Sequence, residues 1–216
     1  MAFDPAMLAL YVVTSASVVT GRDHVDVARA AVAGGATAVQ LRAPELDDPA
    51  LLAAARELVA LGRWAGVATI VNDRVDVAAA ADADGAHLGQ GDAFADVAGR
   101  LGPGRFLGVS VSTPDEARTA EGSGAAYLGV TVWSTATKRE ARPVGLDGLR
   151  AVVRSTRLPV VGIGGIDAAN APEVLAAGAR GVAVVSAVAG ADDMVRATRE
   201  LRAAVDGAPE GGVGAV

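Results

Sequence analysis

Lys138 is the only lysine in the chain, and it follows a run of small residues that carry hydroxyl groups. The 18 other basic residues are all arginine. A lysine ammonium is a compact point charge that binds phosphate, whereas a guanidinium is a planar fork. With the hydroxyls of Thr135 and Thr137, on either side of Ala136, and with backbone N–H groups, Lys138 would form a phosphate-binding loop. The alternative is a surface lysine without a function.

Asp73 and Asp92 are candidate ligands of a divalent cation. Asn72 and Asp73 directly follow the apolar run Thr69–Val71, and Asp92 comes after the next apolar segment. Carboxylates at two adjacent strand ends can converge on one hard cation, and Mg²⁺ is usually held by one or two carboxylates plus substrate phosphates. The alternative is that both aspartates cap the helices that follow them.

Two further segments have the composition of a phosphate site. The run GIGG at 162–165, which includes Gly165, ends one expected strand, and Val185 and Ser186 end the next. Glycine lets backbone N–H groups approach phosphate oxygens closely, although tight turns need glycine as well. Phosphate sites in α/β barrels frequently use the loops after the last two strands. This position favours phosphate binding.

Gln40 and Arg42 alternate along an otherwise apolar run, so their side chains face the same side of a strand. An amide and a guanidinium near a strand end favour ligand contacts, with a rim salt bridge as the alternative for Arg42. His24 and His87 lack the spacing of metal ligands. His24 stands at the start of an expected helix, and we expect His87 to be a hydrogen-bonded strand residue. The sequence contains no Ser-His-Asp pattern.

Alanine-rich stretches that end in glycine and lead into short apolar runs recur along the chain, as in AGGATAVQL at 33–41. Glycine ends a helix at little steric cost, and repeated helix-to-strand units indicate parallel strands with crossover helices. Eight candidate strands start near Leu10, Ala38, Ala68, Gly85, Phe106, Ala126, Val160 and Gly181. Expected helices follow at 23–33, 48–64, 75–81, 93–100, 114–121, 146–154, 169–177 and 192–205.

A regular count of eight predicts an α/β fold, a single (β/α)₈ TIM barrel, with an open doubly wound sheet as the alternative. The catalytic barrel would span residues 1–206, and the glycine-rich residues 207–216 would form a flexible tail. In such barrels function lies on the loops at the carboxyl ends of the strands. The candidate residues would therefore meet at one end of the barrel.

The overall composition excludes several classes of protein. Hydrophobic residues make up 51% of 216, which excludes disorder, and the absence of cysteine excludes disulfides and thiolate metal sites. A net charge of −6 without a basic block argues against nucleic-acid binding. We find neither a leader pattern nor a membrane span and expect a cytoplasmic enzyme that binds small phosphorylated molecules. A homo-oligomer stays possible.

The motifs, taken in order, resemble those of thiamine-phosphate synthases, also called thiamine-phosphate pyrophosphorylases. The matching segments are VQLR at 39–42, VND at 71–73, HLGQGD at 87–92, LGVS at 107–110, TATK at 135–138, VGIGGI at 161–166 and VS at 185–186. The resemblance implies a transferase that joins hydroxymethylpyrimidine diphosphate to thiazole phosphate, giving thiamine phosphate and pyrophosphate. It also implies Mg²⁺ held by Asp73 and Asp92.

The resemblance assigns roles to the other candidates. It implies that the pyrimidine diphosphate is contacted by Gln40, Arg42, Asn72, Ser110 and Lys138. It implies that the thiazole phosphate is contacted by Thr135, Ala136, Thr137, Gly165, Val185 and Ser186. In the implied dissociative mechanism, pyrophosphate leaves first and the thiazole nitrogen traps the resulting cation. Such a reaction needs charge neutralisation and a pre-placed nucleophile rather than a strong base, with Lys138, Arg42 and Ser110 as the catalytic residues.

One departure from the family pattern keeps two alternatives open. The family usually continues the VQLR motif with a lysine that reaches the diphosphate, whereas this chain has Ala43 and Pro44. A degenerate, non-catalytic phosphate-ligand-binding barrel is therefore one alternative. The other is a related thiazole tautomerase, which relies on a histidine where this chain has Ser112. The sequence does not decide between a plain and a carboxylated thiazole phosphate.

Overall fold

The computed structural model describes residues 2–15, 21–89, 97–134 and 142–208. Eight parallel strands form a closed barrel in which each strand pairs with its neighbours in the sequence and β8 pairs with β1. The strands are β1 (Leu10–Val13), β2 (Ala38–Leu41), β3 (Ala68–Asn72), β4 (Gly85–Leu88), β5 (Phe106–Val111), β6 (Tyr127–Thr131), β7 (Val160–Ile163) and β8 (Gly181–Val184). The predicted (β/α)₈ barrel is confirmed. Seven strands start where the sequence predicted, and β6 starts one residue later.

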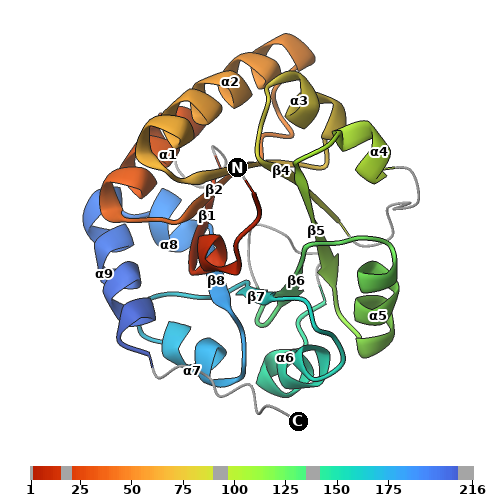
Figure 1. Ribbon diagram of the computed structural model, residues 1–216. Helices are drawn as coiled ribbons and strands as arrows, with labels where there is room; N and C mark the ends of the chain where they lie inside the picture. The colour runs from red at the N-terminus through yellow and green to blue at the C-terminus, as the bar shows by residue number, and fades with distance from the viewer. Residues whose placement is uncertain (1, 16–20, 90–96, 135–141, 209–216) are drawn as a thin grey trace.

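The helices form a ring around the barrel (Figure 1). They are α1 (His24–Gly34), α2 (Asp48–Ala65), α3 (Val75–Ala80), α4 (Val97–Leu101), α5 (Pro114–Gly122), α6 (Gly145–Val153), α7 (Ala171–Ala176), α8 (Ser186–Ala189) and α9 (Met194–Asp206). The four-residue α8 was not predicted. Residues 93–96 of the fourth expected helix, and 209–216 of the expected tail, lie outside the described residues. No described helix is both long and apolar enough to cross a membrane.

Local sequence signals explain where several helices begin and end. The side chains of Asp23 and Asp47 accept hydrogen bonds from backbone N–H groups of the first turns of α1 and α2. Gly35 and Gly66 end the same helices in the left-handed conformation, with φ of 95° and 69°. These signals set the lengths of the helices that return the chain to the start of each strand.

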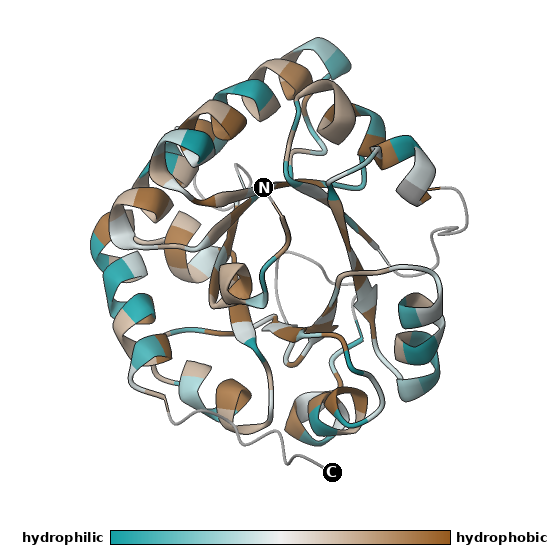
Figure 2. Ribbon diagram, viewed as in Figure 1, coloured by the Kyte–Doolittle hydropathy of each residue, from teal (hydrophilic) through white to brown (hydrophobic). Residues whose placement is uncertain are grey.

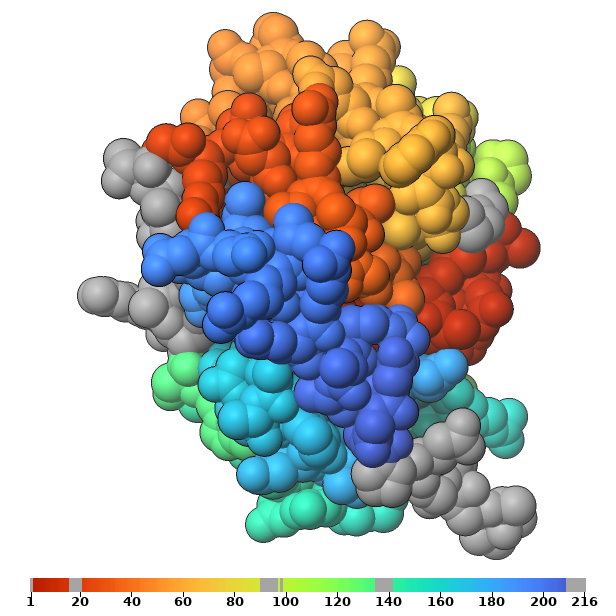
Figure 3. Space-filling model, turned by 90° about the vertical axis from the view of Figure 1, so that its left-hand side faces the viewer, coloured from red at the N-terminus to blue at the C-terminus, as the bar shows by residue number. Residues whose placement is uncertain are grey.

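The strands bury side chains on both faces, as a closed parallel barrel requires. Leu10 and Val12 pack outward against the helices, whereas Tyr11 and Val13 belong to a separate cluster inside the barrel. Figure 2 shows the matching pattern on the helices, whose hydrophobic faces turn toward the strands. In Figure 3, α9 lies against α1, and this contact closes the ring of helices.

The 3₁₀ helix η1 (Pro5–Leu8) precedes β1 and packs at the amino-terminal end of the barrel, against β1 and β8. The ring of Phe3 lies 5.0 Å from that of Phe106 and 6.3 Å from that of Tyr127, both inside the barrel. This segment fills one end of the barrel. The opposite end, at the carboxyl termini of the strands, stays available for a site.

Candidate functional site

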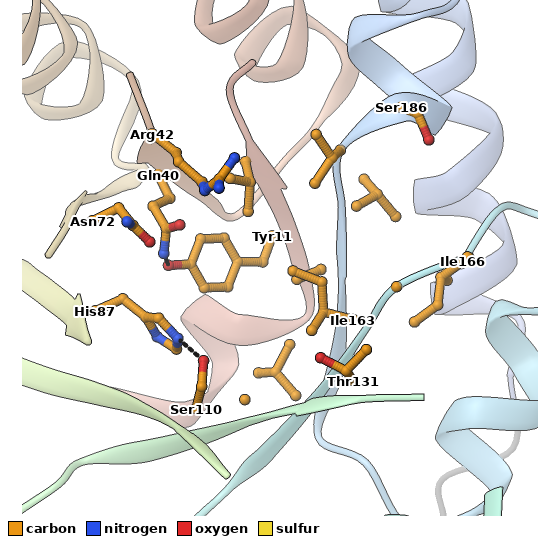
Figure 4. A pocket seen from close by; sticks show the side chains of 18 of the residues that line it. Tyr11, Gln40, Arg42, Asn72, His87, Ser110, Thr131, Ile163, Ile166 and Ser186 are labelled. Atoms are coloured by element: carbon orange, nitrogen blue, oxygen red, sulfur yellow. Dashed lines mark hydrogen bonds between the residues drawn. The ribbon is translucent and has the colours of Figure 1, made fainter. Parts of the chain in front are cut away.

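A pocket opens at the carboxyl ends of the strands, and all eight strands or the residues that directly follow them contribute to its lining. Figure 4 shows polar side chains on one side of this pocket and the turn after β7 and the start of α8 on the other. The lining residues are Tyr11, Val13, Gln40, Arg42, Asn72, His87, Ser110, Tyr127, Gly129, Thr131, Val161, Ile163, Gly164, Gly165, Ile166, Ala183, Val184, Val185 and Ser186. The pocket therefore joins the two groups of residues that the sequence placed at strand ends.

A buried chain of hydrogen bonds forms the floor of this pocket. Gln40, which is 4% exposed, donates through Nε2 to the Tyr11 hydroxyl at 2.6 Å. The Tyr11 hydroxyl lies 3.0 Å from that of Tyr127. Burial raises the pKa of both phenols, so both stay neutral at physiological pH. Because one N–H of the Gln40 amide donates to Tyr11, its oxygen and its second N–H are left for a ligand.

His87 continues this chain of hydrogen bonds on β4. Its Nδ1 lies 2.9 Å from the Tyr127 hydroxyl. Its Nε2 lies 2.9 Å from Ser110 Oγ, the bond that is dashed in Figure 4. A Cβ atom at Gly129 would lie 3.1 Å from the His87 ring, so glycine there makes room for the imidazole. The expected hydrogen-bonded strand histidine is confirmed. What the sequence did not indicate is that His87 lines the pocket beside Ser110.

Arg42 lies just beyond the end of β2 and faces the pocket on the same side as Gln40, as their alternation predicted. Its backbone N–H donates to Thr14 Oγ1 at 3.2 Å. Within the described part of the chain, the guanidinium forms neither a hydrogen bond nor a salt bridge, so the alternative of a rim salt bridge is not realised there. A half-buried guanidinium without a partner at a pocket is an anion-binding group.

Asn72 ends β3 and lines the pocket, and Asp73 follows it with a φ of +59°, which is unusual for a residue with a side chain. The Asn72 amide donates to Asp73 Oδ2 at 2.6 Å. Helix α3 has Arg74 at its N-cap and no side-chain cap, so Asp73 does not act as the helix cap that was its alternative role. Among the described residues no group of three metal-ligating side chains occurs.

The turn after β7 and the start of α8 form the other side of the pocket. Gly164 and Gly165 have φ of 92° and 66°, and both line the pocket with Val185 and Ser186. The Asn170 side chain donates to the Gly165 carbonyl at 2.9 Å and holds the turn. Positive φ at both residues requires glycine, so the turn itself accounts for the motif. Its location beside Ser186 is what makes it part of the site.

Five of the predicted site residues lie outside the described residues: Asp92, Thr135, Ala136, Thr137 and Lys138. The pocket also contains Tyr11 and Tyr127, which the sequence did not single out. A signal for them existed, because they are the only two tyrosines in the chain and both belong to apolar strand runs.

Comparison with known proteins gives one consistent result. The sequence pattern of the thiamine monophosphate synthase family matches residues 10–188. The chain belongs to this family. It is 51% identical to the thiamine-phosphate synthase of Moorella thermoacetica over 199 residues, which cover 91% of this chain and 95% of that protein. It is 52% identical to the corresponding protein of Chloroflexus aurantiacus over 198 residues, covering 91% and 92%.

A solved structure agrees with these relatives. The thiamine phosphate pyrophosphorylase of Pyrococcus furiosus superimposes with a TM-score of 0.87 at 43% identity, covering 94% of this chain and 97% of that one. A 3-hexulose-6-phosphate synthase, at 21% identity and a TM-score of 0.65, shares the fold alone. The chain is therefore an enzyme of thiamine biosynthesis, a transferase that acts on small phosphorylated substrates. This confirms the predicted family, fold and reaction class.

Proposed function

We propose that this pocket is where hydroxymethylpyrimidine diphosphate and thiazole phosphate meet to form thiamine phosphate and pyrophosphate. The observation that carries the proposal is that one pocket unites two groups of predicted residues. Gln40, Arg42, Asn72 and Ser110 lie on one side, and Gly165, Val185 and Ser186 lie on the other. A two-substrate condensation needs both reactants held side by side.

The pyrimidine ring would bind on the floor of the pocket. Gln40 offers an amide oxygen and one N–H, since its other N–H already donates to Tyr11. Ser110 adds a hydroxyl that His87 holds in place. An aminopyrimidine carries N–H donors and ring-nitrogen acceptors, so an amide oxygen and a hydroxyl are complementary to it. Apolar side chains of the pocket, such as Val161 and Ala183, exclude water from the ring.

The diphosphate would bind above this ring, beside Arg42 and Asn72, with Lys138 as a second cation. Asp73 fits the metal role in chemistry and place, because its carboxylate lies at a strand end beside Asn72 and caps no helix. Asp92 would be the second carboxylate. Bound Mg²⁺ would supply positive charge to the leaving diphosphate. Arg42 and Lys138 stabilise the same developing charge directly.

The thiazole phosphate would bind on the opposite side of the pocket. Gly165 and Val185 offer backbone groups and Ser186 offers a hydroxyl at the pocket surface. Thr135, Ala136 and Thr137 would complete this phosphate site from the loop after β6. With the phosphate fixed there, the thiazole nitrogen faces the pyrimidine before the diphosphate leaves. This order matters because water would otherwise capture the pyrimidine cation.

A turnover assay with both substrates and Mg²⁺ tests the proposal. Formation of thiamine phosphate and an equal amount of pyrophosphate is the expected result. Tight binding of both substrates without product would instead support the binding-protein alternative. No observation supports the tautomerase alternative. Ser112 stands where the tautomerase has its histidine, and it does not line the pocket.

A further inference from the structure

His24 is a buried histidine close to the pocket that the proposed chemistry does not use. It begins α1, and its side chain is 4% exposed. Its Nδ1 lies 2.8 Å from Thr14 Oγ1, and its Nε2 lies 2.6 Å from Glu45 Oε1. A carboxylate can only accept, so Nε2 donates to Glu45. In the neutral ring, Nδ1 then accepts from the Thr14 hydroxyl. His24 thus links the segments that follow β1 and β2.

Glu45 lies in the segment that also carries Arg42. Partial burial raises the pKa of Glu45, but the hydrogen bond from His24, a backbone hydrogen bond and the nearby charge of Arg42 outweigh it and lower the pKa overall. Arg42 and Glu45 therefore interact electrostatically. The hydrogen bond of the carboxylate nevertheless goes to His24 and not to the guanidinium.

The consequence is visible at Arg42. The backbone N–H of Arg42 is fixed by Thr14, the same hydroxyl that His24 contacts, while its guanidinium has no partner within the described residues. Arg42 is also the only basic residue in the segment 42–47, which reads RAPELD. A free carboxylate three residues away would compete with any anion for this guanidinium.

We propose that His24 is a positioning residue that binds Glu45 and thereby keeps the Arg42 guanidinium free for the diphosphate of the substrate. The identity of the anion rests on the proposed function. The competition between Glu45 and an anion rests only on the contacts of His24, Thr14 and Glu45. The role of His24 and the proposed function can therefore fail separately.

Two substitutions of His24 separate its two contacts. The amide of His24→Asn reaches the position of Nδ1 and keeps the contact with Thr14, but it leaves Glu45 free. The longer amide of His24→Gln reaches the position of Nε2 and can still donate to Glu45. By calorimetry with inorganic pyrophosphate and Mg²⁺, we expect binding to weaken about five- to tenfold in His24→Asn. In His24→Gln it should stay within about threefold of wild type.

A substitution of Glu45 distinguishes this role of His24 from a purely structural one. Glu45→Gln removes the competing charge, so the double variant with His24→Asn should recover binding to within about threefold of wild type. In turnover assays, His24→Asn should raise the KM for the pyrimidine diphosphate and leave that for the thiazole phosphate unchanged. A double variant that binds as weakly as His24→Asn alone would overturn the proposal, as would unchanged binding in His24→Asn.

Glu45, the exposed partner of His24, gives a test that does not depend on altering a buried residue. Glu45→Asp keeps the charge but shortens the side chain, so it should lose His24 and weaken pyrophosphate binding several-fold, whereas Glu45→Gln should not. Equal binding by these two variants would also overturn the proposal. If wild-type enzyme forms no thiamine phosphate, the proposed function fails, and the pyrophosphate titrations still decide the role of His24.

Discussion

The floor of the pocket differs from its rim, which is formed by Arg42, Asn72 and the adjoining Asp73 at the strand ends, in how its polar groups are paired. On the floor, the polar side chains of Tyr11, Tyr127 and His87 are buried or half-buried and bonded to one another. At the rim, Arg42 has no side-chain partner within the described residues, and Asp73 adopts a positive φ. A satisfied network gives a fixed shape that recognises a neutral ring, whereas a guanidinium without such a partner is suited to a ligand that brings its own charge. Substitutions should therefore damage stability on the floor and catalysis at the rim.

The largest effect is expected for the two charged residues that we propose to act on the diphosphate. Lys138→Ala and Asp92→Ala should each lower kcat by about a hundredfold or more, since one preorganised charge lowers the activation barrier by on the order of 3 kcal/mol. The melting temperature should not change. Arg196→Ala, which removes an exposed arginine on α9, is the matched control and should leave kcat unchanged. Wild-type kcat in Lys138→Ala would show that the site assignment is wrong.

On the floor of the pocket we expect a loss of stability rather than of catalysis, and a smaller change in free energy. Tyr127→Phe removes the hydroxyl between Tyr11 and His87 and leaves buried polar groups without a partner, which should cost about 1–3 kcal/mol of unfolding free energy. Urea denaturation measures this loss. Arg42→Ala, treated in the same way, should lose less than about 0.5 kcal/mol. If both variants lost the same stability, the contrast between floor and rim would not hold.

The smallest effect concerns pH and Glu45, which lies in the segment that follows Arg42. Burial raises the pKa of Glu45, but the hydrogen bond from His24 and nearby positive charge make the net shift downward from the ordinary value of 4.5. A lowered folded-state pKa adds stability above the unfolded value, and this stability is lost as the pH falls through the folded value. The difference in unfolding free energy between wild type and Glu45→Gln should therefore be largest near neutral pH. It should shrink below about pH 4.5. A difference that is independent of pH would contradict this.

The fold could be predicted from the sequence because its signals are local. Alternating helix and strand patterns, and glycines such as Gly35 and Gly66 at helix ends, fix the elements within short windows. Parallel strands joined by helices then leave few topologies. The unpredicted α8 is only four residues long, too short to show a helical period.

The site was only partly predictable, because its contacts depend on closure of the barrel. Gln40 and Arg42 could be assigned from alternation on one strand. The hydrogen bond from Gln40 to Tyr11 and the contact of Tyr127 with His87 join residues 29 and 40 positions apart, and no local pattern encodes them. The same holds for His24 and Glu45, whose side chains meet only because β1 and β2 are neighbours.

The packing of Phe3 against Tyr127 has a practical consequence. The same phenol ring touches the amino-terminal segment on one side of the barrel interior and carries the hydrogen bonds of the pocket floor on the other. An affinity tag fused in front of residue 2 would begin next to this aromatic contact, so we expect it to perturb the pocket floor. A tag placed beyond α9, on the outer ring of helices, leaves that contact intact and is the better choice for kinetic work.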